Sequence, residues 1–218
     1  MATIPEAATA APRDRILDAA DRLLARFGYR KMTVEDLARE AGMGKGTVYL
    51  SFPSKADVAL ACIDRMADRL LARLQSIAAA PGPAEPKLHA MLLERVMHRF
   101  DYARPHSASI DGLLDSIRAP LLERRREYFR REARAIAAVI EQGHRSGAFA
   151  VTDATAAARA CVFATNSLLP FSLSVEELGQ RKEIQRRAEE IAQLLLRGIV
   201  AAPSGGRHPG GARRRTRR

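Results

Sequence analysis

The sequence predicts an all-α protein, and three observations support this. Ala, Leu and Arg, which favour helices, dominate the 218 residues, and Trp is absent. Apolar residues recur at spacings of three and four along most of the chain, and no segment shows the alternation of a β-strand. Glycines and prolines interrupt this pattern where helices should begin or end.

The net charge of +11 limits the class of partner. Six of the arginines lie in the last fifteen residues, 204–218, which contain no acid. A basic chain suggests an anionic partner, and nucleic acid is the first candidate.

Metal, cofactor and membrane binding find no support in the sequence. Cys62 and Cys161 are the only cysteines, and no Cys/His spacing is typical of a metal site. We therefore expect the thiols to fill the core and no cofactor to bind. The longest uncharged run, 160–175, is too short to cross a bilayer, and the N-terminus lacks the pattern of a signal peptide. These features favour a cytoplasmic protein without a membrane partner.

The chain divides into four segments by composition. Residues 1–11 and 203–218 are too rich in small residues, Pro or Arg to bury a core, so we expect a disordered arm and a disordered Arg-rich tail. Residues 12–57 are predicted to form a small helical unit, and residues 58–202 a larger helical domain.

A helix-turn-helix is predicted in the small unit. Thr33 is the expected N-cap of a second helix over 34–41, with Asp36 completing a variant of the capping box. Gly42 ends this helix, and a third short helix should follow over about 45–50. Helix, glycine-containing turn and short helix together make a helix-turn-helix.

Longer helices are predicted for the rest of the chain. Ser54 and Asp57 form another cap-like pair at the start of a fourth helix, and Asp153 is the expected N-cap of the penultimate one. After the break at 78–86, we expect helices over about 86–103, 107–117, 120–145, 153–168 and 175–200.

The segment GKGTVYLSFPSK, Gly44–Lys55, has a composition that packing alone does not explain. Val48 and Phe52 share one face at i and i+4 and should hold the short helix in the core. The remaining side chains offer cations, hydroxyls and close backbone approach, which suit the major groove and phosphates of DNA. The candidate DNA-binding residues are Thr33, Gly44, Lys45, Gly46, Thr47, Tyr49 and Lys55. An ordinary turn between core helices is the alternative.

The segment TVEDLAREAGMGKGTVYLSFPSKADV, residues 33–58, resembles the DNA-binding segment of TetR-family transcriptional regulators. The matching positions are Thr33, Ala41-Gly42, Lys45-Gly46-Thr47-Val48-Tyr49, Phe52 and Ser54-Lys55. Gly44 and Ser51 depart from the family pattern, which usually has a small hydroxyl residue and an aromatic or His there. The resemblance implies an N-terminal three-helix DNA-binding domain followed by a larger helical domain for ligand binding and dimerisation.

The resemblance also implies a homodimer formed by the last two long helices, and hence a palindromic operator. The candidate interface residues are Ala157, Ala160, Ala164, Leu168, Ile184, Ala188, Ile191, Leu195 and Ile199. Packing within one subunit is the alternative for this set.

A cavity for a small effector in the larger domain is a further implication of the resemblance. The candidate wall residues are Met66, Leu70, Met91, His98, Tyr102, Leu113, Ile117, Phe129, Phe163 and Asn166. Their apolar character suggests a hydrophobic or amphipathic effector, and simple core packing is the alternative for each residue.

We therefore expect a sequence-specific DNA-binding transcriptional regulator, a repressor released by a small-molecule effector. An enzyme is not expected, because no catalytic motif is present. The alternative is a nonspecific or architectural DNA-binding protein that uses the basic tail. The basic stretch 124–134 is predicted to be a solvated face with pairs such as Glu127–Arg131.

Overall fold

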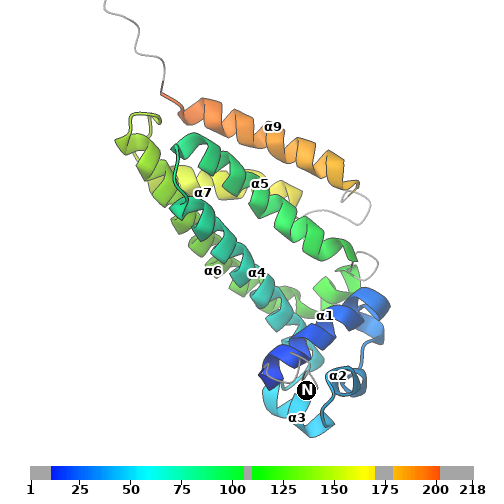
Figure 1. Cartoon of the computed structure of the whole chain (residues 1–218). Helices are drawn as coiled ribbons and strands as arrows, with labels where there is room; N and C mark the ends of the chain where they lie inside the picture. Colours follow the sequence, from blue (N-terminus) through cyan, green and yellow to red (C-terminus); the bar gives the residue numbers. More distant parts are fainter. Residues whose placement is uncertain (1–10, 106–109, 170–178, 202–218) are drawn as a thin grey trace, which may run out of the picture.

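The structure, a computed structural model, describes residues 11–105, 110–169 and 179–201, and these residues are helical apart from short connections (Figure 1). The all-α prediction is confirmed. The elements are α1 (Pro12–Lys31), α2 (Val34–Glu40), α3 (Lys45–Ser51), α4 (Lys55–Ala79), α5 (Ala84–Ala103), α6 (Ile110–Arg145), α7 (Ala154–Ala164), the 3₁₀ helix η3 (Thr165–Leu168) and α9 (Arg181–Ile199).

Two groups of helices share α4. The helices α1, α2 and α3 gather at one end of the molecule, while α5, α6, α7 and α9 form the larger body (Figure 1). Val58 and Cys62 near the start of α4 belong to the core of the first group, and Leu70 and Leu74 farther along belong to the core of the second. A single continuous helix therefore joins the two cores.

Helix ends form where the sequence predicts them. Thr33 and Asp36 make the capping box of α2 in both directions, and Ser54 accepts a hydrogen bond from the Asp57 amide at the start of α4. Asp153 caps α7 by accepting from the amide of Ala156 at 2.8 Å. These local side-chain bonds satisfy amides that have no partner inside the helix.

One of the predicted boundaries is wrong. We expected separate helices over 107–117 and 120–145, but α6 runs through Pro120 as one helix. Ile117 and Leu121 on either side of this proline are buried against α4, and this packing outweighs the loss of one backbone hydrogen bond. The penultimate helix ends its α-helical part at Ala164 and tightens to η3. The predicted start of the last helix, at 175, lies outside the described residues.

The basic stretch 124–134 is only partly the solvated face that we predicted. Glu132 and Tyr128 are buried, and Arg131 pairs with Asp68 of α4 at 2.8 Å rather than with Glu127. Glu127 instead pairs with Arg130 at 2.8 Å. Because side chains of one helix point to different sides, some residues of this stretch face the core and others face solvent.

The connection between α6 and α7 is closed by a buried aromatic ring. Phe149 lies directly over Gly143, where an added Cβ would come within 2.1 Å of the ring. The Ala150 amide donates to Ile199 O at 2.8 Å and the Ala201 amide to Ala148 O at 3.0 Å. This single antiparallel bridge joins the α6–α7 connection to the end of α9.

No helix within the described ranges combines the length and the hydropathy that a membrane crossing requires.

We predict that Gly143→Ala lowers the free energy of unfolding by about 1–3 kcal/mol, because the methyl group and the Phe149 ring cannot occupy the same space. Urea denaturation followed by circular dichroism measures this change. The matched control is Gly198→Ala in α9, where a Cβ meets nothing within 4 Å; there we expect a gain of about 0.5–1 kcal/mol. Equal effects at the two glycines would contradict the role of Phe149.

Candidate functional site

The turn between α2 and α3 is fixed from α1. Gly42 has φ +64°, a left-handed conformation that glycine adopts without strain. The Arg15 guanidinium donates to Ala41 O at 2.7 Å and to Gly42 O at 3.2 Å, and the Met43 amide donates to Ala38 O at 2.9 Å. The carbonyls at the end of α2 are thereby satisfied, and the angle between α2 and α3 is set.

One face of α3 is held in the core and the other faces solvent. Val48 and Phe52 are buried as predicted, and the Arg13 guanidinium covers the Phe52 ring at 4.3 Å. Among the predicted DNA-binding residues, Gly44, Lys45, Gly46, Thr47 and Tyr49 are all exposed on this short segment, with Tyr49 46% accessible. An added Cβ on Gly46 would meet nothing within 4 Å, so this face is open to a large partner.

Lys45 does not extend freely from this surface. Its ammonium forms an ion pair with Glu35 of α2 and lies 5.9 Å from the centre of the Tyr49 ring. The hydrogen bond from Lys45 lowers the pKa of Glu35, and the same bond raises the pKa of Lys45. A phosphate that approaches α3 must therefore compete with Glu35 for this cation.

Thr33 and Lys55 already have partners within the chain. The Thr33 hydroxyl donates to Asp36 Oδ2 at 2.7 Å and accepts from the Asp36 amide at 3.1 Å. The Lys55 ammonium donates to Tyr29 O at 3.0 Å and lies over the Tyr29 ring at 4.4 Å, which fastens α4 to the end of α1. Contact of either residue with DNA stays a prediction.

Leu50 is a surface residue of α3 that sequence reasoning missed. Its side chain is 91% exposed, the largest exposure among the large hydrophobic side chains of the described residues. The sequence does indicate this exposure, because Leu50 lies two residues after the buried Val48 and therefore on the opposite face of the helix. An exposed leucine on a short polar helix can contact thymine methyl groups in a major groove.

The segment that contains the helix-turn-helix matches a known sequence family. Residues 16–62 match the family model described as bacterial regulatory proteins, tetR family. The chain belongs to the TetR family of helix-turn-helix transcriptional regulators. Members of this family are regulators rather than enzymes, and they bind DNA operators and small-molecule effectors.

Relatives of the chain include bacterial regulatory proteins. It is 24% identical over 188 residues to the fatty acid metabolism regulator protein of Bacillus subtilis, a match that covers 85% of this chain and 94% of that protein. It is 33% identical over 89 residues to the HTH-type transcriptional repressor KstR of Mycolicibacterium smegmatis, which covers 40% of this chain and 44% of that protein.

Solved structures of transcriptional regulators share the whole fold. One from Cytophaga hutchinsonii superposes with a TM-score of 0.73 at 20% identity, covering 86% of this chain and 98% of the other. FadR from Bacillus subtilis in complex with stearoyl-CoA superposes with a TM-score of 0.64 at 18% identity, covering 85% and 98%. The larger domain thus has the TetR architecture, although its sequence differs widely.

The predicted effector-pocket residues lie in three different surroundings. Leu70, Met91 and Ile117 are fully buried among other apolar side chains, and Leu113 packs against the DNA-binding core. Met66, His98 and Tyr102 line a hollow of about 360 Å³. Phe129, Phe163 and Asn166 line a groove of about 810 Å³ between α6 and α7. The ten residues therefore do not form one cavity wall in this structure.

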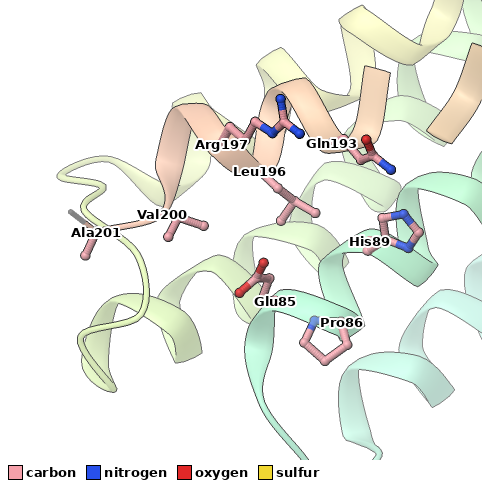
Figure 2. A pocket seen from close by; sticks show the side chains of 8 residues that line it. All are labelled: Glu85, Pro86, His89, Gln193, Leu196, Arg197, Val200 and Ala201. Atoms are coloured by element: carbon pink, nitrogen blue, oxygen red, sulfur yellow. The ribbon is translucent and has the colours of Figure 1, made fainter. Parts of the chain in front are cut away.

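A third hollow, shown in Figure 2, contains none of the predicted residues. It measures about 650 Å³ and lies between the first turns of α5 and the end of α9. Its lining residues are Glu85, Pro86, His89, Gln193, Leu196, Arg197, Val200 and Ala201. One acid, one arginine and one histidine on an open, mostly apolar surface give it no strong preference for a ligand charge.

The charged cluster inside the larger domain was also missed by sequence reasoning. Arg95 and Arg99 of α5 are buried together with Glu132 of α6, and Arg95 donates to Glu132 Oε2 at 2.7 Å. Arg95 also donates to the Thr165 hydroxyl at 2.6 Å, and Arg99 pairs with the other Glu132 oxygen. Two buried guanidinium groups share one carboxylate, so one positive charge in this cluster is not compensated by Glu132.

All five predicted dimer residues of α9 contact their own chain. Ile184 and Ala188 are buried, mainly against α5, while Ile191, Leu195 and Ile199 are half-buried. On α7, Ala160 is exposed, Ala157 and Ala164 are half-buried, and Leu168 of η3 is buried. Ile184, Ala188 and Leu168 thus pack within one subunit, and a dimer contact of the predicted set stays a prediction.

We predict that Glu35→Gln tightens operator binding several-fold at low salt and less at high salt. The substitution removes the carboxylate that competes with phosphate for Lys45, and it lowers repulsion between α2 and DNA. Fluorescence anisotropy with labelled operator DNA measures the effect. Glu85→Gln, which makes the same charge change in the first turn of α5, is the matched control. An identical gain in both variants would mean that net charge, and not release of Lys45, is responsible.

Proposed function

We propose that the protein works in the cytoplasm as a homodimeric repressor that binds a palindromic operator and is released from it by a small hydrophobic or amphipathic effector. Each subunit would insert α3 into the major groove of one half-site. Because the two subunits are related by two-fold symmetry, the two half-sites would form a palindrome.

One observation carries the DNA-binding part of this proposal. The short helix α3 has its apolar residues Val48 and Phe52 in the core, while Lys45, Thr47 and Tyr49 are exposed together on the outside. Its orientation is fixed by Arg15 at the turn and Arg13 at Phe52. A helix of seven residues is unstable alone, so this presentation depends on the surrounding core.

The exposed sides of α7 and α9 support a dimer. Ala160 and the half-buried Ala157 and Ala164 form a small-residue surface on α7, and Leu194 of α9 is 71% exposed. Small side chains permit close approach of helices from a second subunit, and burial of Leu194 would add to the free energy of association.

Effector control requires a mechanical link between the larger domain and α3. The helix α6 supplies one, since Leu113 near its start packs on the DNA-binding core and its second half borders the groove at α7. A second link is the Tyr102 hydroxyl of α5, which donates to Asp21 of α1 at 2.9 Å. Arg65 of α4 also contacts this part of α1, where it forms ion pairs with Asp18 at 2.6 Å and Asp21 at 2.7 Å.

Relatives support the class of effector. The chain is similar across most of its length to a fatty acid metabolism regulator, and the similar structures include FadR with stearoyl-CoA and a complex of SmeT with triclosan. Triclosan is largely apolar, and stearoyl-CoA joins a long apolar chain to a polar, anionic coenzyme A group, in agreement with a hydrophobic or amphipathic effector. The relative KstR is a repressor, which favours repression as the sign of control.

Selection from random duplex DNA at physiological salt tests the function. We expect recovery of a palindrome with half-sites about one helical turn apart, or a multiple of it, both with the full chain and with a variant that ends before residue 204. Binding to every duplex that falls steeply with salt and is lost without the tail would instead indicate a nonspecific DNA-binding protein.

We predict that Tyr49→Phe weakens binding to all duplexes to a similar degree, because the exposed hydroxyl would donate to a phosphate that is present in every sequence. Affinities for the selected operator and for a scrambled duplex give the measurement. Leu50→Ala is the informative comparison, since loss of an apolar contact to bases should reduce the preference for the operator. Unchanged operator affinity of Tyr49→Phe would refute the phosphate contact.

A further inference from the structure

The groove between α6 and α7 has an unusual lining. On α6 it is bordered by residues that recur at spacings of three and four between 122 and 141, which is a single stripe of the helix. At 1.5 Å per residue this stripe is roughly 29 Å long. On α7 the lining residues Thr155, Arg159 and Val162 also share one side of the helix, and Asn166 of η3 follows them. The groove is thus a long channel between two packed helices, with a volume of about 810 Å³.

Arginines supply nearly all of the charge in this groove. Five of them line it, four from α6 and one from α7, against a single acid, Glu141. Those five are Arg125, Arg126, Arg130, Arg134 and Arg159. Arg130 pairs with Glu127 at 2.8 Å, whereas Arg126, Arg134 and Arg159 form no ion pair with any residue that the structure describes. The electrostatic potential along the groove is therefore strongly positive.

Apolar side chains lie between these arginines. Phe129, Ala133, Ala137 and Val162 line the groove and also pack into the core of the larger domain. Phe163 beside them is 67% exposed. A ligand that covers this surface would gain hydrophobic free energy from the apolar residues and charge-assisted hydrogen bonds from the arginines.

A buried guanidinium beneath the groove points to the same ligand class. Arg95 Nη2 is buried and has no hydrogen-bond partner among the described residues. Asn166 Oδ1 is also buried and unpartnered, but it is an acceptor and does not itself favour an anion. Arg95 lies 4.9 Å from the centre of the Phe129 ring and donates to Thr165, next to Asn166, so its charge is close to the groove. Burial lowers the pKa of Arg95, and a nearby anion would offset the cost of keeping this guanidinium charged.

We propose that this groove is the effector site and that the effector is an amphipathic anion, with an apolar chain along Phe129, Ala137 and Val162 and a carboxylate or phosphate headgroup bound by Arg126, Arg134 and Arg159. The assignment rests on the proposed effector-controlled function, and it names the site and the chemistry of the ligand.

The groove is compatible with a dimer that forms through α7. The groove side of α7 carries residues 155, 159 and 162, while the predicted interface residues 157, 160 and 164 lie on another side of the same helix. Ligand binding between α6 and α7 can therefore change the angle of α6 without removing the dimer contact. Because Leu113 of α6 packs against the DNA-binding core, that change would reach α1 and, through it, α3.

The test uses four ligands with the same chain length, dodecyl phosphate, dodecanoate, dodecanol and dodecyltrimethylammonium, together with inorganic phosphate. Binding to the full-length protein is measured by calorimetry below the micelle-forming concentration. We expect one or both of the anionic amphiphiles to bind, which also distinguishes a phosphate from a carboxylate headgroup. Dodecanol, the cation and inorganic phosphate should bind at least about tenfold more weakly, because each lacks one half of the recognised chemistry.

Two variants locate the site. Arg126→Ala combined with Arg134→Ala removes exposed headgroup contacts, and Ala138→Glu places a carboxylate on the groove surface. Each should weaken anionic amphiphiles by about tenfold or more. The matched control is Arg118→Ala, an exposed arginine of α6 that does not line the groove and should bind as the unchanged protein does. Melting temperatures without ligand confirm that the variants are folded.

Three results would overturn the assignment. They are equal binding of dodecanol and the anions, binding that the groove variants do not change, and a loss of operator affinity in these variants without any ligand, which would make the groove a DNA contact. A different result separates the two proposals. If the anionic amphiphiles bind and the groove variants abolish binding, but the operator complex persists with ligand, the ligand assignment stands and effector-controlled release is refuted.

Discussion

Burial of the apolar face of α4 in two separate cores is the constraint on which the rest of the structure depends. The helices α2 and α3 have seven residues each, too few to be stable on their own. They persist because α1 and the first turns of α4 bury Leu37, Val48 and Phe52 with them. Farther along, Leu70 and Leu74 tie α4 into the larger domain. Any tilt of α4 therefore moves the surface formed by α3.

Positive charge is arranged in three ways within the chain. At α3, Lys45 is exposed but paired with Glu35, so its charge is available only to a stronger anion. Inside the larger domain, two arginines share Glu132 and remain one charge in excess. Along the α6–α7 groove, arginines alternate with apolar residues at the surface. Arginine and lysine thus supply the predicted phosphate contact at α3, a charged cluster inside the larger domain and the proposed site for an amphipathic anion.

How well a site residue could be placed from the sequence depends on how far apart in the chain its contacts lie. The capping box at Thr33, the turn at Gly42 and the two faces of α3 follow from contacts between residues close in sequence, and the structure has all of them. The pocket residues stay a prediction, because helical periodicity identifies an inward face but not what that face contacts. Met91 and Phe129 have similar patterns, yet one is fully buried among apolar side chains and the other borders a groove.

The sequence by itself determined the helical class, the helix-turn-helix and the residues that α3 exposes, because caps, glycine turns and i,i+4 spacing act within a few residues. Only the tertiary structure decided that α6 continues through Pro120, that Glu132 is buried between Arg95 and Arg99, and that five arginines line one groove. These features depend on which distant helices pack together. Packing energy can override a local preference such as a proline break, and a charge becomes buried or exposed only when a neighbouring helix covers it or leaves it open.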